Sequence, residues 1–108
     1  IAQLMENDIL KGVYQEEEQV PSTNELARMF RINPATAAKG VNLLVDEDIL
    51  YKKRGIGMFV ATGAVERIRQ KRKGAFYENF VKTLVSEAKS LAIGNQELLE
   101  MIQKAQQE

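Results

Sequence analysis

The chain has 108 residues, of which 44% are hydrophobic and 28% charged, and this is ordinary for a globular protein with one domain and an appendage. It contains no cysteine and no histidine, which excludes thiol nucleophiles, disulfides and metal sites built from thiolate or imidazole; only a carboxylate site remains open. The net charge is zero, but residues 1–51 hold nine acidic and four basic side chains, whereas residues 52–73 hold one acidic and eight basic.

The first predicted element is a helix that ends near Gly12, because Ile1, Leu4, Met5 and Ile9 recur at helical spacing. The segment VYQEEEQV (13–20) then predicts a loop with a short strand at its last two residues. We interpret its glutamates, like the acidic cluster at 46–48, as solvated charge rather than as a catalytic carboxylate pair. No cofactor is therefore expected.

Two short helices follow. The pattern Ser22-x-x-Glu25 is a capping box that predicts a helix over 22–30, with Leu26, Ala27, Met29 and Phe30 as its buried stripe. After a short RIN linker, Asn33 and Pro34 suit the N-cap and first position of a third helix. Two helices joined so closely indicate a helix-turn-helix.

The third helix has an apolar face and a face of low relief. Ala37, Val41, Leu44 and Val45 share the first face, and the second contains Ala35, Lys39 and Asn42 with Thr36 on its flank. Small residues let a helix backbone approach the base edges of the major groove. Gly40, in the helix interior, is expected to cost roughly 1 kcal/mol relative to alanine.

The segment ILYKKRGIGMFVAT (49–62) predicts a β-hairpin whose turn contains glycines and whose basic residues lie at and before the turn. Gly55 and Gly57 permit either a positive φ or a close approach of the backbone. Helix, helix, small-faced helix and basic hairpin are the order of a winged helix-turn-helix, in which the wing contacts phosphates and the minor groove.

A long helix is predicted from about residue 65 to 92, with Gly94 as a left-handed cap and Asn95 as the N-cap of a final helix. We interpret the basic residues at the start of this helix as a solvated surface rather than as a DNA contact. The two apolar stripes are too large to cover each other, so we expect a second copy of the chain to cover them. The predicted dimer residues are Tyr77, Phe80, Val81, Leu84, Val85, Ala88, Leu91, Leu98, Met101 and Ile102.

The segment QVPSTNELARMFRINPATAAKGVNLLVDEDILYKKRGIGMFV (19–60) resembles the DNA-binding domain of GntR-type bacterial transcription regulators. The resemblance is carried by PS..ELA, INP.T and GIGMFV, and the tail is similar to the two-helix tail of the YtrA subfamily. It implies a homodimer that binds a pseudo-palindromic operator on double-stranded DNA, usually as a repressor. The implied DNA-binding residues are Ser22, Thr23, Asn24, Asn33, Ala35, Thr36, Lys39, Lys53, Arg54, Gly55 and Gly57.

The expected fold class is mainly α with a small β-hairpin wing, divided into a DNA-binding domain over 1–62 and a dimerisation tail over 63–108. A winged-helix module that binds protein instead of DNA stays open, because the first half of the chain is acidic. The sequence also leaves open a small-molecule effector, without locating its site. No apolar run reaches the roughly 20 residues of a membrane span, and no signal peptide opens the chain, so we expect a cytoplasmic protein. Because the first residue is Ile1 rather than Met, residues before it remain an open question.

Overall fold

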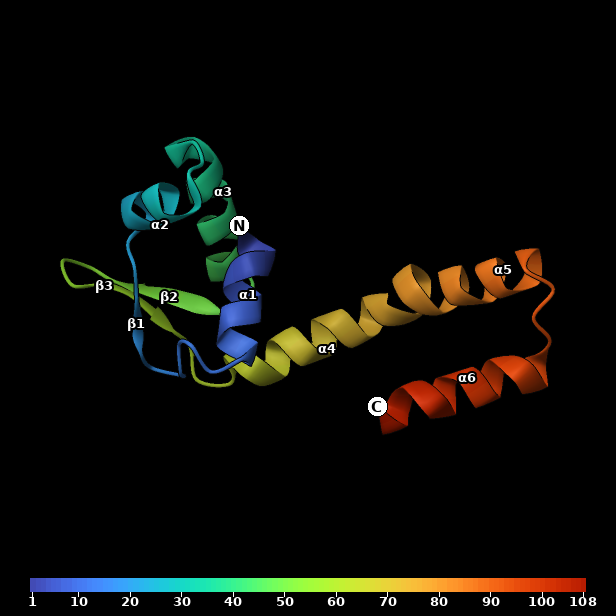
Figure 1. Cartoon of the computed structure of the whole chain (residues 1–108). Helices are drawn as coiled ribbons and strands as arrows, with labels where there is room; N and C mark the ends of the chain where they lie inside the picture. Colours follow the sequence, from blue (N-terminus) through green and yellow to red (C-terminus); the bar gives the residue numbers. More distant parts are fainter. The chain divides into compact units, whose positions relative to one another are not determined.

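The computed structural model describes residues 1–108, which divide into two compact units, residues 1–71 and residues 72–108 (Figure 1). The first unit contains three short helices, a three-stranded antiparallel sheet and the start of a fourth helix. The second unit is entirely helical. This order of elements confirms the predicted winged helix-turn-helix with a helical tail.

Helix α1 (Ala2–Leu10) packs Met5 and Ile9 into the core of the first unit. Leu4, which belongs to the same predicted helical spacing, is instead 48% exposed. The buried apolar residues of α1, Met5 and Ile9, are four positions apart and lie on one face of the helix. Leu4 is rotated by about 100° from that face.

A close approach between α1 and α3 explains the glycine within α3 (Pro34–Asp46). A Cβ atom on Gly40 would lie 1.9 Å from Cγ2 of Ile1, so any larger residue would push α1 outward. The expected cost of this glycine to the helix is therefore offset by tight packing of α1 on α3.

Helix α2 (Thr23–Phe30) begins with the predicted capping box. The Ser22 hydroxyl oxygen accepts a hydrogen bond from the backbone N–H of Glu25 at 3.1 Å, and the Glu25 carboxylate accepts one from the Ser22 N–H at 3.1 Å. Met29 was predicted to be buried, and this is wrong: 58% of it is exposed, because α2 turns only Leu26 and Ala27 fully into the core.

Helix α3 begins as predicted, with Asn33 Oδ1 accepting a hydrogen bond from the Ala35 N–H at 2.7 Å and Pro34 in the first position. The turn before it is closed by Arg31 in a left-handed conformation. Ala37, Val41 and Leu44 are buried on the predicted apolar face, and Val45 packs against the core at its edge.

The sheet contains β1 (Gln19–Val20), β2 (Leu50–Lys53) and β3 (Gly57–Val60) in the order β1-β3-β2. Both pairings are antiparallel, with Gln19 opposite Phe59 and Tyr51 opposite the same residue on the other side. The predicted short strand is thus a third strand on the predicted hairpin. The largest fully buried side chains of the unit are Met5, Ile9, Leu26, Val41, Leu44, Ile49, Leu50, Val60 and Ile68.

The glutamates of the loop before β1 are exposed, as predicted, but they also connect the loop to the base of the hairpin. The Glu16 carboxylate accepts hydrogen bonds from the N–H groups of Gly63, at 2.7 Å, and Val65, at 3.4 Å. The Glu17 carboxylate accepts from the hydroxyls of Tyr51, at 2.5 Å, and Thr62, at 2.6 Å. These acidic groups therefore stabilise the start of the next helix.

The hydrogen bond from Thr62, followed by that from Tyr51, lowers the pKa of Glu17 below the ordinary value for glutamate. A lowered carboxyl pKa contributes stability above the unfolded-state pKa, and this contribution is lost as the pH falls through the folded-state value. We expect Glu17→Gln to melt below the wild type at pH 7, with the difference closing between about pH 5 and pH 3. Thermal melts of both proteins at pH 7 and at about pH 3 test this expectation, with Glu18→Gln as the control. A difference in melting temperature between wild type and Glu17→Gln that stays constant with pH would contradict it.

Helix α4 (Ala64–Phe76) begins in the first unit. Ala64 and Ile68 are fully buried in the core. The Arg67 guanidinium donates hydrogen bonds to the carbonyl oxygens of Asp48, at 3.0 Å, and Thr62, at 2.9 Å. The basic start of this helix was predicted to be solvated only, and for Arg67 that is wrong, because its side chain holds α4 against the loop after α3.

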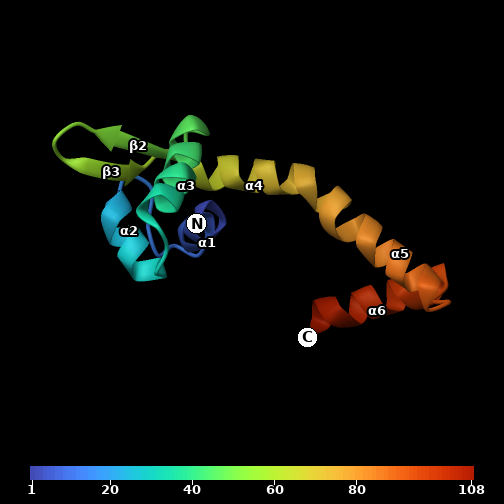
Figure 2. The same ribbon diagram turned by 90° about the horizontal axis from the view of Figure 1, so that it is seen from above.

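In the second unit, a π-helical turn, η1 (Tyr77–Val81), interrupts the predicted long helix before α5 (Lys82–Ser90). Helix α6 (Asn95–Gln107) then folds back beside α5, as Figures 1 and 2 both show. No helix in the structure has the length and apolar character that crossing a membrane requires.

The link between α5 and α6 differs from the prediction. Gly94 is not left-handed but extended, and it, not Asn95, precedes α6 as the N-cap. The left-handed residue is Ala92, with φ of 57°. The reason is a Schellman-type end, in which the Ile93 N–H bonds the Ala88 carbonyl at 2.9 Å and brings the Ile93 side chain back toward the apolar face.

Candidate nucleic-acid interface

The starts of α2 and α3 are both capped by side chains that the resemblance assigns to DNA binding. The oxygens of Ser22 and Asn33 already accept hydrogen bonds from their own helices. Their first role is thus to fix where each helix begins, which orients the remaining N–H groups that suit a phosphate. Hydrogen bonds from the backbone and then the side chain of Ser22 lower the pKa of Glu25. An ionised Glu25 offsets the positive end of α2, so a phosphate there needs nearby cations.

The outer face of α3 carries mostly small side chains, as the sequence predicted. Ala35, Thr36 and Lys39 are all exposed. Lys39 forms no ion pair or hydrogen bond through its side chain within the chain. Asn42, further along, accepts a hydrogen bond from Lys52 of β2 at 3.3 Å, which joins α3 to the hairpin.

The hairpin turn is supported by Gln19, a residue that the sequence prediction did not select. Its Nε2 donates a hydrogen bond to the Ile56 carbonyl at 3.1 Å. A Cβ on Gly57 would lie 2.4 Å from the same nitrogen, so glycine at this position makes room for the glutamine. Gly57 also has a φ of 147°, while Gly55 has a φ of 77° with open space around it. The pairing of β1 with β3 and the contact of Gln19 with the hairpin turn both join distant residues, so the local sequence pattern could not predict them.

A hollow of about 510 Å³ lies between the start of α2 and the hairpin. It brings together predicted residues from two distant parts of the sequence. It is lined by Ser22 and Thr23 from α2 and by Lys52, Lys53, Arg54, Gly55 and Gly57 from the hairpin, among others. Asn24 lies outside it, in an open hollow of about 450 Å³ with Arg28 and Pro34.

The two lysines of β2 point to opposite faces of the sheet. Lys53 lies on the outer face, with its Nζ 4.6 Å from the ring centroid of Phe59, which stacks on Tyr51 at 5.7 Å. Lys52 lies on the other face and reaches α3. The sequence prediction selected Lys53 alone, but strand alternation places Lys52 nearer to the predicted recognition helix.

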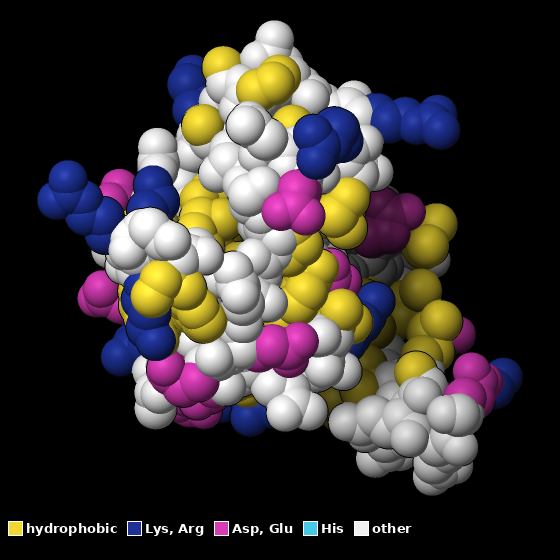
Figure 3. All heavy atoms as spheres, turned by 90° about the vertical axis from the view of Figure 1, so that its left-hand side faces the viewer, with side chains coloured by type: hydrophobic (Ala, Val, Ile, Leu, Met, Phe, Trp, Pro, Cys, Tyr) yellow, Lys and Arg dark blue, Asp and Glu magenta, His cyan; other side chains and the backbone are white.

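Other cations that the sequence prediction passed over border the helix-turn-helix. Arg28 and Arg31 are exposed at the end of α2. The side chains of Arg31 and Arg54 form no hydrogen bond or ion pair within the chain. Figure 3 looks at the side of the first unit that carries the hairpin tip, and it shows Lys and Arg side chains projecting from this face.

The second unit carries a different kind of surface. An apolar groove of about 330 Å³ runs between α5 and α6. Of the predicted dimer residues, Leu84, Ala88, Leu91, Leu98, Met101 and Ile102 line it. Ala88 is already buried between the helices, whereas Leu84 is 44% exposed and Leu91 is 62% exposed.

An aromatic cluster precedes this groove along the chain. Tyr77 and Phe80 are 57% and 64% exposed, and the ring of Phe80 lies 5.6 Å from that of Phe76. The sequence prediction missed Phe76 because the stripe was started one residue later. Val81 and Val85 border this cluster, in a shallow hollow that also contains Tyr77.

The sequence model of the gntR family of bacterial regulatory proteins matches residues 1–60, which is more than half of the chain. The chain belongs to the GntR family. Membership of a family of regulatory proteins agrees with the prediction that it is not an enzyme.

The GntR match extends to whole-chain similarity in some relatives. The transcriptional repressor YtrA of Bacillus subtilis is 28% identical over 104 residues, which cover 96% of this chain and 79% of YtrA. A solved GntR-family regulator from Bacteroides thetaiotaomicron is 34% identical, with a TM-score of 0.79 over 98% of this chain and 92% of that one. BusR of S. agalactiae, solved with its busA-promoter DNA, is 25% identical, with a TM-score of 0.65 over 96% of this chain and 52% of BusR.

Other curated GntR-type relatives are larger proteins. They match about 66 residues of this chain, and the chain spans only 27% of their length. The match to these relatives covers about 61% of this chain.

Proposed function

We propose that this GntR-family protein is a sequence-specific DNA-binding transcription regulator that acts as a homodimer. Each first unit would place α3 in the major groove of one half-site of a pseudo-palindromic operator, with the hairpin tip on the adjacent backbone and minor groove. Such a regulator works on the chromosome and so in the bacterial cytoplasm.

One observation carries the proposal: the start of α2 and the cationic hairpin line a single hollow. A phosphate in this hollow would meet backbone N–H groups of α2 together with Lys52 and Arg54. The small side chains on the outer face of α3 would suit the major groove, and the neighbouring hollow would suit the sugar-phosphate backbone. The shape and the charge of this surface therefore both favour DNA.

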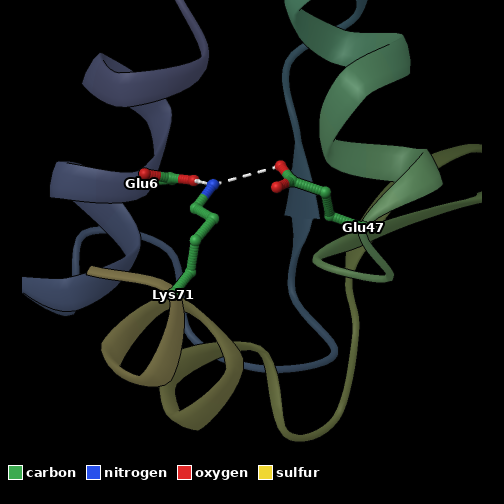
Figure 4. A network of polar contacts seen from close by, with 3 residues as sticks. All are labelled: Glu6, Glu47 and Lys71. Atoms are coloured by element: carbon green, nitrogen blue, oxygen red, sulfur yellow. Dashed lines mark hydrogen bonds and ion pairs between the residues drawn. The ribbon is translucent and has the colours of Figure 1, made fainter. Parts of the chain in front are cut away.

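The acidic first half of the chain, which favoured a protein-binding module, has another explanation. Glu16 and Glu17 hold the base of the hairpin, and Glu47 pairs with Lys71 of α4 (Figure 4). The hairpin base is the opposite end from the tip that carries Arg54. The acidic side chains thus serve the fold of the first unit, and the protein-binding alternative loses its main support.

The names of the relatives support the repressor role and the DNA partner. YtrA is described as a repressor, and BusR has been solved on promoter DNA. The similarity to YtrA spans nearly the whole chain, so it includes the helical tail.

The proposed homodimer rests on the apolar surface of the second unit. Leu84, Leu91 and Met101 line the groove and are exposed, as are Tyr77 and Phe80 of the aromatic cluster. Exposed apolar side chains gathered in this way mark an interaction site in many proteins. A second copy of the tail has the same apolar character and can satisfy it in an isologous contact.

The proposal predicts a measurable role for Lys39. Lys39→Ala should weaken operator binding about three- to tenfold and lower the slope of log affinity against log salt by about one, because one phosphate contact is lost. Fluorescence anisotropy titrations at several salt concentrations check it. Lys11→Ala, at the end of α1, removes the same charge away from the interface and should leave the slope unchanged. Equal slopes for wild type and Lys39→Ala would show that Lys39 faces solvent in the complex.

A further inference from the structure

The tip of the β2–β3 hairpin exposes an apolar side chain beside its cations. Lys53 pairs with Gly57 in the sheet, so the tip consists of Arg54, Gly55 and Ile56. It projects beyond the helices of the first unit (Figures 1 and 2). Ile56 is 63% exposed, more than any other large hydrophobic side chain of this unit. The core of the unit therefore makes little use of this isoleucine.

The backbone of Ile56 is fixed on both sides although its side chain is exposed. Its N–H donates a hydrogen bond to the Lys53 carbonyl at 3.0 Å. Its carbonyl accepts one from Nε2 of Gln19, on strand β1, at 3.1 Å. Because both backbone polar groups have partners within the chain, Ile56 presents only hydrocarbon to a molecule that meets the tip. An exposed side chain on a fixed backbone suits recognition rather than packing.

The neighbours of Ile56 in the chain make the tip narrow. Gly55, on one side, has open space where a Cβ would be, and a Cβ on Gly57, on the other, would meet the Gln19 amide. Both glycines have a positive φ, of 77° and 147°. The minor groove of DNA is about 6 Å wide, so a single branched side chain between two glycines can enter it. The two cations that precede Gly55 remain for the phosphates on either side.

The chemistry of the minor groove determines what an isoleucine can distinguish there. An A·T pair presents only acceptor atoms on the groove floor, whereas a G·C pair adds the 2-amino group of guanine. This amino group occupies the space that a branched side chain needs. It also loses its water without gaining an acceptor, because the Ile56 side chain offers none, and a donor left unpaired in this way is costly. An apolar tip therefore favours A·T pairs.

We propose that Ile56 is a specificity-determining residue, which selects A·T over G·C pairs in the minor groove beside each half-site. Gln19 is its positioning residue, because the hydrogen bond from Gln19 holds the Ile56 carbonyl and so fixes the direction of the side chain. This inference rests on the proposed function and deepens it: α3 reads the major groove, and the hairpin tip adds a separate reading of the minor groove.

A modified base separates the two grooves. The probe is the duplex that the wild-type protein selects from a randomised pool, in which each A·T pair is replaced in turn by G·C and by inosine·C. Inosine lacks the 2-amino group of guanine but presents the same N7 and O6 acceptors in the major groove. A position read in the major groove therefore treats inosine·C like G·C, and a position read in the minor groove treats it like A·T.

Four variants are titrated as full-length protein against this series, with circular dichroism to show that they fold. Ile56→Ala removes the side chain that enters the groove, and Ile56→Val keeps its branched shape. Gln19→Leu removes the amide donor while Ile56 stays. Leu4→Ala is the matched control, because Leu4 is also exposed but lies on α1, which carries no predicted DNA contact.

In the wild type we expect at least one position per half-site where G·C lowers the affinity about tenfold while inosine·C stays within about twofold of A·T. Leu4→Ala and Ile56→Val should keep this difference. Ile56→Ala should reduce it below about threefold, and Gln19→Leu should reduce it to a similar degree because the side chain is no longer aimed. Discrimination at positions read in the major groove should be unchanged in all four variants, which a general loss of structure would not allow.

A wild type that selects a duplex but prefers inosine·C to G·C at no position overturns the inference and leaves the proposed function intact. Undiminished discrimination by Ile56→Ala also overturns it, and would assign the minor groove to Arg54 instead. Wild-type discrimination by Gln19→Leu would overturn the positioning role of Gln19. If the wild type selects no duplex at all, the proposed function fails and this inference fails with it.

Discussion

We expect Leu84→Asp to convert the proposed dimer to a monomer and to lower the affinity for the operator by about a hundredfold or more. Leu84 is partly exposed on the wall of the α5–α6 groove, so the monomer tolerates a polar residue there. In the proposed dimer the same position is covered, and burial of an unpaired carboxylate costs several kcal/mol. A monomer then binds a single half-site. It loses the gain in affinity of about 10²–10⁴-fold that two linked binding units obtain from their high effective concentration.

Sedimentation equilibrium and anisotropy titration on the same samples measure both effects. Gln103→Asp is the matched control, because it places the same charge at an exposed position of α6 that is two residues from Met101 and so on the opposite side of that helix. It should remain a dimer and bind as the wild type does. A dimeric Leu84→Asp would place the contact between copies elsewhere than the α5–α6 groove.

We expect Ile68→Ala to lower the free energy of unfolding of the first unit by about 2–5 kcal/mol, the range for isoleucine to alanine in a packed core. Ile68 is fully buried although it lies in the most basic segment of the chain. For a unit of this size, such a loss lowers the melting temperature by about 10 °C or more. Chemical denaturation followed by circular dichroism gives the free energy directly.

Ile56→Ala is the control for the same chemical change at an exposed site. Ile56 lies at the tip of the hairpin and is 63% exposed, so its replacement should change the stability by less than about 0.5 kcal/mol. Equal losses in the two variants would mean that the start of α4 is not part of the core.

The local parts of the fold could be predicted because their signals lie within a few residues of one another. The capping box of α2, the Asn33–Pro34 start of α3 and the glycine turn of the hairpin each place a side chain or a backbone angle next to the element that it shapes. Periodicity likewise identified the buried face of α3. These elements are the ones that the structure confirms.

The parts that could not be predicted depend on contacts between distant residues. Ile1 above Gly40 and Gln19 beside Gly57 explain why these two positions are glycine, but no local pattern pairs them. The burial of Ile68 is hidden among arginines and lysines, so the sequence assigned the whole of α4 to the tail. A side chain that appears solvated in a charged helix can thus be an anchor.

The end of α5 shows how a local rule can fail. Glycine is the usual left-handed residue at a helix end, and Gly94 was predicted on that basis. The structure uses Ala92 instead, because Ile93 must return to the apolar face and this fixes the end two residues earlier. Packing of one isoleucine outweighs the modest strain of an alanine at positive φ.

The central claim is tested most directly by binding of the wild-type protein to DNA. Duplexes that cover the promoter regions of its own genome, and random duplexes of equal length, are titrated at several salt concentrations. We expect at least one promoter duplex to bind about 10³-fold or more tightly than random DNA, with affinity that falls steeply as salt rises. Equal affinity for every duplex, or binding that does not respond to salt, would contradict the proposal that this chain is a sequence-specific DNA-binding regulator.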